Sequence, residues 1–175
     1  MKKTVALIGF FAFLLAIRPA ALRAQENFQS VTGDDFTKAV PNDFYLEGNR
    51  IPVEKRNAAL LKTGKGARVV LALIDTTGYS SQIKQKYIGM VISETQISVC
   101  GVSIGVGSYG FGLELPAAGS NADAQFRLYN QAGEKLGECA VKVDDSIKQP
   151  VPLAVTIAKD GSASLNLGKY ALAIK

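Results

Sequence analysis

Ser81 and Lys84 have the Ser-x-x-Lys spacing of a nucleophilic serine with a lysine base. Lysine acts as a base only when burial keeps it uncharged, yet Lys84 lies in the polar run QIKQK. The chain has no histidine, which excludes histidine-based catalytic triads and histidine metal sites. A small hydrolase using Ser81 and Lys84 is therefore kept as an alternative function.

Asp75 is the second candidate for catalysis, because it ends an apolar run in ALIDTTGYS. This run resembles the Asp-Thr/Ser-Gly loop of aspartic proteases, with Thr77 inserted before the glycine. The chain has one such loop, so a pair of carboxylates sharing a proton would need a homodimer. The other interpretation is a turn in which Asp75 and Thr76 close a strand and cap a helix at Ser80.

Two glycine-rich motifs overlap in the middle of the chain. Gly101, Ser103 and Gly105 match the nucleophile elbow of α/β hydrolases, but neither a histidine base nor a strand-to-helix context accompanies them. Gly105, Gly107 and Gly110 match a dinucleotide-binding motif, which requires a helix to follow. Here the next residues alternate as a strand and stop at a proline. Glycine bulges in a curved sheet explain both motifs, and we predict no cofactor.

Aromatic and polar side chains beside glycine-rich or polar loops are the predicted ligand-binding residues. They are Asp75, Thr76, Tyr79, Tyr109 and Phe111. Such rings can contact sugars or peptides, although strand aromatics also pack in cores. The adjacent carboxylate pairs at 34–35 and 144–145 point to opposite faces in an extended chain, so we predict no metal site.

The N-terminus has the pattern of a cleaved secretory signal peptide. A positive start at residues 2–3 precedes an apolar run over residues 4–17. That run is shorter than the roughly 20 residues that a membrane span needs. The small residues that follow predict cleavage after Ala24, with Ala20 and Ala21 as alternatives. We therefore expect a periplasmic or secreted protein with no membrane span after cleavage.

Most of the positive charge belongs to this leader. The chain has 20 basic and 15 acidic residues. Lys2, Lys3, Arg18 and Arg23 lie in the leader, so 16 basic residues face 15 acidic ones in the mature chain, a net charge of +1. Because no basic cluster remains, we do not expect nucleic acid as a partner.

Cys100 and Cys139 are the two cysteines of the chain. An exported protein can keep a disulfide, and a bridge here would contribute roughly 3–4 kcal/mol in the chain-entropy model. The alternative is two buried thiols that pack as small apolar residues. The sequence leaves both open, because it does not show whether the two Cα atoms approach each other.

From Phe44 onward, apolar residues repeat with a period near two, which is typical of β-strands. The run VVLALI is apolar on both faces and belongs in the middle of a sheet. A shift of apolar parity at Gly137 predicts a bulge, and Asp160 with Gly161 predicts a two-residue hairpin turn. Residues 80–87 predict one short helix.

These elements predict a mostly β fold, an antiparallel β-sandwich or a partly open β-barrel with one short helix. Residues 1–24 are the predicted signal peptide and residues 25–43 a polar N-terminal arm or loop, in which a helical turn can start near Asp34. Residues 44–175 then form a single β domain, since about 150 residues are the length of one domain.

The runs TQISVCGVSIGVGSYGFGLELP and PLAVTIAKDGSASLNLGKYALAIK resemble a strand-turn-strand motif and a C-terminal hairpin of uncharacterised exported bacterial β domains. The resemblance implies a β architecture and no activity. Without a convincing catalytic set, the expected function is a non-enzymatic binding or structural module, with an unknown protein, peptide or glycan as partner. A subunit of a larger assembly would instead expose an apolar edge strand or patch.

Overall fold

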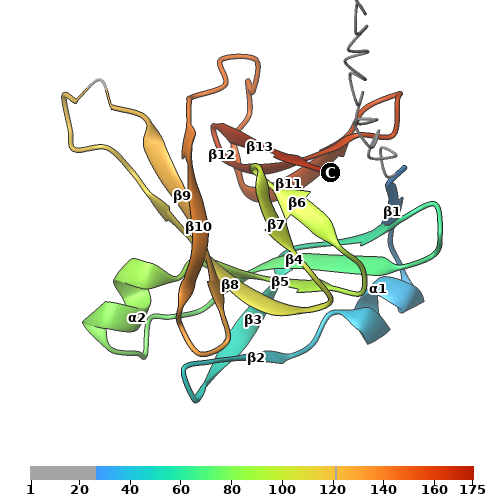
Figure 1. The fold of residues 1–175 in the computed structure, drawn as a ribbon, viewed down its shortest axis with the longest axis horizontal. Coiled ribbons are helices and arrows are strands. Elements are labelled where there is room, and N and C mark those ends of the chain that lie inside the picture. Colours follow the sequence, from blue (N-terminus) through green and yellow to red (C-terminus); the bar gives the residue numbers. More distant parts are fainter. Residues whose placement is uncertain (1–26, 121) are drawn as a thin grey trace, which may run out of the picture.

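The computed structural model describes residues 27–120 and 122–175. The predicted signal peptide and its cleavage site lie outside these residues. The described chain forms two antiparallel β-sheets that pack against each other as a sandwich and do not close into a barrel (Figure 1). The predicted mostly β fold is confirmed.

The larger sheet has eight strands in the order β1-β3-β4-β5-β8-β9-β10, and β2 pairs with β3 beside this path. The apolar run VVLALI forms β4, which lies between β3 and β5 as its pattern predicts. The strands are β1 (Gln29–Val31), β2 (Asp43–Leu46), β3 (Asn49–Lys62), β4 (Arg68–Ile74), β5 (Gly89–Ser93), β8 (Gly107–Glu114), β9 (Ala124–Asn130) and β10 (Lys135–Val141).

The smaller sheet has five strands in the order β11-β12-β13-β6-β7. Its C-terminal strand lies between two others, so the chain end is held inside the sheet. An isolated bridge between Val143 and Tyr170 connects the segment after β10 to this sheet. The strands are β6 (Ile97–Val99), β7 (Val102–Ile104), β11 (Val151–Ile157), β12 (Ala163–Gly168) and β13 (Tyr170–Ile174).

The main core lies between the two sheets, where alternate side chains of both point inward. Phe111 and Phe126 pack against each other in this core, with their ring centroids 5.6 Å apart. Phe28 joins them from the N-terminal side, before the first strand. The other buried members come from both sheets: Leu61, Val69, Leu71, Val91, Ile97, Val99, Ile104, Leu128, Val141, Leu153, Ala163, Leu165, Leu167, Leu172 and Ile174.

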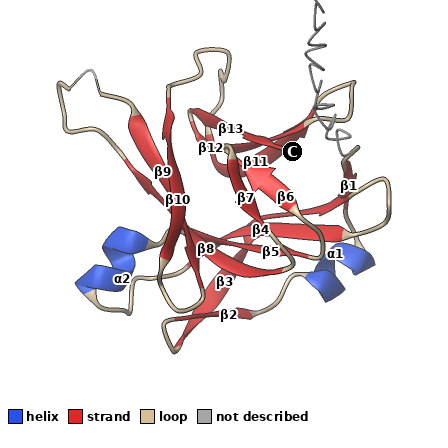
Figure 2. Cartoon of the chain, in the orientation of Figure 1, coloured by secondary structure: helices blue, strands red, loops and turns tan. Residues whose placement is uncertain are grey.

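A second core covers the outer face of the larger sheet. Helix α1 (Asp34–Ala39), strand β2 and helix α2 (Ser81–Lys86) pack there, with the helices on either side of β2 (Figure 2). Helix α2 begins after Ser80, whose Oγ accepts a hydrogen bond from the Ile83 amide, so the predicted cap is present. Ile83 and Tyr87, four residues apart, are both buried in this core.

The segment predicted as an N-terminal arm or loop holds two elements, β1 and α1. Strand β1 pairs with the end of β3, and Val40, just after α1, is buried in the second core. The structure thus has two short helices: the predicted one, and α1, which begins at Asp34, where the sequence allowed a helical turn. Both elements are too short to give a readable apolar period.

The two predicted turn irregularities had different outcomes. The register of β10 against β9 shifts between Lys135 and Gly137, which confirms the bulge. The predicted two-residue turn at Asp160 and Gly161 is wrong, because residues 158–162 form the connection between β11 and β12. The Asp160 carboxylate accepts hydrogen bonds from the amide and hydroxyl of Ser162, which stabilises the longer loop.

Candidate functional site

The predicted residues at the end of β4 form a closed turn. Asp75 Oδ1 accepts hydrogen bonds from the Thr77 hydroxyl at 2.6 Å and the Thr77 amide at 3.0 Å. These bonds lower the pKa of the Asp75 carboxyl. Tyr79 donates its hydroxyl hydrogen to the Arg50 carbonyl, and its amide bonds to the Thr76 carbonyl. Asp75 is therefore occupied by its own loop, as the turn interpretation predicts.

Tyr109 and Phe111 lie on β8 and pack against the core between the sheets. Phe111 has no exposed surface, so no ligand can contact it in this fold. Tyr109 is half-buried and donates to the Gly105 carbonyl at 3.3 Å. Tyr79 packs on the second core, on the opposite face of the larger sheet. The structure thus does not bring the predicted ligand-binding residues together.

Ser81 and Lys84 are both exposed on the short helix α2. The alternative hydrolase needs Lys84 to be desolvated enough to lose its proton. Because Lys84 is exposed to water, this requirement is not met, so the pair has no structural basis as a nucleophile and base. Ser103 of the glycine-rich motif is likewise exposed, on strand β7, and no helix follows it.

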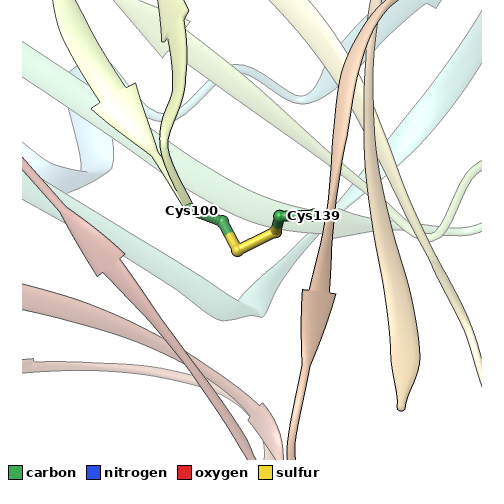
Figure 3. Close-up of a disulfide and its surroundings, with 2 residues drawn as sticks. All are labelled: Cys100 and Cys139. Carbon is green, nitrogen blue, oxygen red and sulfur yellow. A yellow bond between two sulfur atoms is a disulfide. The ribbon is translucent and has the colours of Figure 1, made fainter. Parts of the chain in front are cut away.

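Cys100 and Cys139 form a disulfide with their Cα atoms 6.2 Å apart (Figure 3). Cys100 and Gly101 make the two-residue turn between β6 and β7, and both have positive φ, 51° and 81°. Cys139 lies in β10 of the other sheet. Of the two alternatives left by the sequence, the structure has the bridged one, and the bridge joins the two sheets across the edge of the core.

A turn of the same kind lies on the outer face of the larger sheet. Glu47 and Gly48 connect β2 to β3 with φ of 48° and 75°. Glu47 Oε1 accepts hydrogen bonds from Lys86 Nζ at 2.5 Å and from the Tyr87 hydroxyl at 2.6 Å. Lys86 Nζ also donates to the Gly133 carbonyl at 2.6 Å. We call these four residues, Glu47, Lys86, Tyr87 and Gly133, the Glu47 network.

Aromatic rings surround the cation of this network. Lys86 Nζ lies 5.2 Å from the ring centre of Tyr87 and 4.9 Å from that of Tyr129, and both rings attract a cation through their π faces. Hydrogen bonds from Lys86 and Tyr87 lower the pKa of the Glu47 carboxyl. Burial, and then the bond to Glu47, raises the pKa of the Tyr87 phenol. Near neutral pH the network therefore holds a carboxylate and a protonated phenol.

Beside the Glu47 network, α2 and β9 enclose an open depression of about 520 Å³. Gln82, Gln85 and Lys86 line it from the helix, where residues three and four apart share one face. Arg127 and Tyr129 line it from β9, where residues two apart share one face. The depression thus combines two amides, two cations and a phenol, and it is open to solvent.

Ion pairs surround Arg127 on the strands beside it. Its guanidinium contacts Glu114 of β8 at 2.6 Å and Glu138 of β10 at 3.2 Å. Glu138 also accepts from Lys135 at 3.0 Å, and these bonds lower the pKa of the Glu138 carboxyl. The guanidinium is therefore held in place by carboxylates on both neighbouring strands.

The hairpin of β9 and β10 is fixed at two points. The disulfide holds β10 to the smaller sheet. At the tip of the hairpin, the Glu47 amide donates to the Gln131 carbonyl at 2.8 Å, and Lys86 Nζ donates to the Gly133 carbonyl. Since Arg127 and Tyr129 lie on this hairpin, both attachments position the depression. Lys86 and Arg127 are therefore preorganised, whereas the exposed Gln82 and Gln85 side chains would lose rotamer freedom on binding a ligand.

Another depression, of about 440 Å³, lies at a bulge in β3 and is lined by Glu54, Lys55, Arg56 and Asn57. Asn57 Nδ2 donates to Glu54 Oε2 at 2.7 Å, so part of its lining is bonded within the bulge. It has no aromatic side chain. The depression at α2 and β9 offers a wider set of interactions, and we take it as the candidate site.

The free edges of both sheets carry features that oppose pairing with another strand. Strand β10 has the bulge at Gly137 and the charges of Lys135 and Glu138. Strand β11 contains Pro152, which cannot donate a ladder hydrogen bond. The edge strands β1 and β7 have three residues each, and β2, which pairs with β3 alone, has four. The edges thus offer little to an added peptide strand or a second copy.

Sequence reasoning did not identify the residues of this site. Gln82, Gln85 and Lys86 lie in the predicted helix, but their neighbours Arg127 and Tyr129 are more than 40 residues away in the chain. Glu47 and Lys86 are 39 residues apart. The one local signal was Glu47 followed by glycine at the end of an apolar run, which marks a turn and not its long-range partners.

Comparison of the chain with protein-family models, with curated proteins and with solved structures gives no match. The resemblance to exported bacterial β domains stays a prediction from the sequence. Among residues 27–120 and 122–175, no helix is long and apolar enough to cross a membrane. Function is therefore argued from the geometry of the site.

Proposed function

We propose that this protein is a periplasmic or secreted, non-enzymatic binding module that recognises its ligand at the depression between α2 and β9. The observation that supports it most is the set of ligand-ready side chains there, mounted on elements that the Glu47 network and the disulfide hold in place. Export is supported by the signal-peptide pattern and by a disulfide, which persists in oxidising compartments.

Free hydrogen-bonding groups on a fixed backbone are what a binding surface needs. The amides of Gln82 and Gln85 are exposed, and no hydrogen bond joins them to the described residues. Their carbonyl and amino groups can each bond to a ligand. The cations Lys86 and Arg127 are held by carboxylates, which suits contact with a ligand better than proton transfer.

The alternative of a small hydrolase has no observation in its favour. Asp75 is bonded within its own turn, and Ser81 and Lys84 are exposed to water. We therefore carry one proposed function only.

Two variants test whether binding occurs at this depression. The labelled mature protein is applied to an array of oligosaccharides and peptides, as wild type, as Gln82→Ala/Gln85→Ala and as Gln96→Ala. Gln96 is an exposed glutamine between β5 and β6, away from α2, and serves as the matched control. Loss of two hydrogen bonds of about 1 kcal/mol each predicts a weakening of about 10- to 30-fold in the double variant. Equal binding by all three proteins would contradict the proposed site.

Export is tested separately. Cells expressing the full chain are fractionated, and the N-terminus of the purified product is sequenced. A product that begins at Gln25 in the periplasm or medium is expected. An intact N-terminus in the cytoplasm would contradict the proposed location.

A further inference from the structure

We infer that the depression between α2 and β9 binds an uncharged oligosaccharide. This inference rests on the proposed function and names the class of ligand for the same site. It follows from three features of the depression: its charge balance, its mixture of hydrogen-bond donors and acceptors, and its position on a strand inside the sheet.

The charges at the depression cancel. Lys86 is paired with Glu47, and Arg127 lies between Glu114 and Glu138. Lys135, next to Glu138, is the third cation of the group, so three cations face three carboxylates. An anionic ligand would have to displace carboxylates that already hold these cations and would be repelled by them. A ligand without charge meets neither cost.

The hydrogen-bonding groups suit hydroxyls, which both donate and accept. Gln82 and Gln85 each offer a donor and an acceptor, and the Glu114 and Glu138 carboxylates offer further acceptors beside Arg127. Tyr129 lines the depression, and its hydroxyl makes no hydrogen bond to the described residues. Sugar hydroxyls can therefore bond alternately to donors and acceptors along this surface.

The apolar part of the lining is small, because Lys86 Nζ lies over the Tyr129 ring. Tyr129 is 7% exposed, so it supplies a small apolar area at the floor of the depression. Because the depression is open, it can accept a stretch of a longer chain.

The depression is less suited to binding an extended peptide. Extended peptides gain most of their affinity by adding a strand to a free sheet edge. Strand β9 lies between β8 and β10 and is paired on both sides, so its backbone is not free to receive one. The edges that are free carry the bulge, the proline or the short strands described above.

The experiment compares matched neutral and charged sugars on the folded mature protein. The array holds neutral glucans, mannans and N-acetylglucosamine oligomers, the same backbones carrying carboxylates at C6, and peptides of neutral and acidic composition. We expect retention of one or more neutral oligosaccharides. For the retained sugar, we expect at least tenfold weaker retention of its C6-carboxylated form. Amide resonances of α2 and β9 should shift in ¹⁵N spectra when the neutral sugar is added.

The outcomes separate the class of ligand from the site. Preferential binding of a carboxylated sugar or a peptide that Gln82→Ala/Gln85→Ala weakens would overturn the inference and leave the proposed site standing. Binding of a neutral sugar that this double variant and Gln96→Ala leave unchanged would show recognition elsewhere on the surface and overturn both. An array on which the wild-type protein retains nothing would also overturn both.

Discussion

Two hairpin turns of this protein have the same backbone and different attachments. Cys100 with Gly101 and Glu47 with Gly48 are both two-residue turns in which each residue has positive φ. In both, a residue other than glycine adopts a conformation that L-residues rarely take. Each of these side chains then reaches the β9 and β10 hairpin, Cys100 by a covalent bond to Cys139 and Glu47 through Lys86.

The difference between the two turns is physical. A disulfide acts largely by restricting the unfolded chain, and it does not depend on a proton near neutral pH. An ion pair acts in the folded state and depends on the charge of both partners. The turn at Cys100 should therefore contribute more to the stability of the fold, whereas the contribution of the turn at Glu47 should depend on pH.

Removal of the disulfide should have the largest effect on stability. The chain-entropy model gives a loss of about 4 kcal/mol for a sequence separation of 39 residues. We expect Cys100→Ser/Cys139→Ser to lower the free energy of unfolding by this amount in urea titrations. Wild-type protein measured with a reductant should match the double variant. A loss below about 1 kcal/mol would mean that the unfolded chain is already compact at this loop.

The Glu47 network should be disrupted most by a methyl group at Gly133. A Cβ there would lie 2.2 Å from Glu47 Oε1 and 2.5 Å from its Cδ, and the φ of 87° adds backbone strain. We expect Gly133→Ala to cost about 2–4 kcal/mol from strain and lost hydrogen bonds together. It should also weaken ligand binding, because Gly133 bonds to Lys86, which lines the depression.

Gly119→Ala is the control for that variant. Its φ of 81° imposes similar backbone strain, and nothing lies within 4 Å of the added Cβ. A Gly133→Ala protein no less stable than Gly119→Ala would show that Glu47 moves away from the methyl group at no cost. Urea titration of both proteins at pH 7 makes the comparison.

The sequence predicted the strands and the possible disulfide, but it did not predict the contact between Glu47 and Lys86. Alternation of apolar residues and the run VVLALI were enough to predict β4 and its place in the sheet, because those patterns reflect local burial. The sequence also indicated a possible disulfide, since Cys100 and Cys139 are the two cysteines of the chain. The contact of Glu47 with Lys86 carries no such mark, because it depends on how β2, α2 and the β9 and β10 hairpin pack.

Phe111 is a residue whose predicted role in ligand binding the structure does not support. Its place beside glycines favoured a ligand-binding loop, but β8 lies inside the larger sheet and directs this ring into the core. The nearby Gly89 and Gly110 are close to large side chains: a Cβ on Gly89 would lie 2.2 Å from the Phe111 ring. The glycines of this region make room for aromatic rings in the packed interior.

The response to pH should distinguish the ionic turn from the covalent one. The folded pKa of Glu47 is lowered, so its stabilisation is present above the unfolded pKa of about 4.3 and is lost as pH falls through the folded pKa. We expect Glu47→Gln to cost about 1–3 kcal/mol at pH 7 and progressively less below pH 4. Glu114→Gln, which breaks a surface pair, should cost less than about 1 kcal/mol. A cost for Glu47→Gln that stays constant down to pH 2 would contradict the ionic attachment.

The stability of the protein at alkaline pH tests the same network through Tyr87. Its folded pKa is raised, first by burial, so the folded protein retains a proton that the unfolded chain releases near pH 10. Stability should fall as pH rises past 10, and Tyr87→Phe should make that fall shallower by one proton. The slope of unfolding free energy against pH between 9.5 and 11 measures it.

The smallest expected difference concerns the second residue of each turn. Gly48 and Gly101 have φ of 75° and 81°, and a Cβ on either would meet nothing within 4 Å. Alanine at each should therefore cost only backbone strain, about 1 kcal/mol. Equal losses in urea titrations would show that the two turns differ in their side-chain attachments alone. A Gly48→Ala loss larger by more than about 1 kcal/mol would mean that the ionic turn depends on its backbone for placing Glu47, whereas the disulfide holds Cys100 in place.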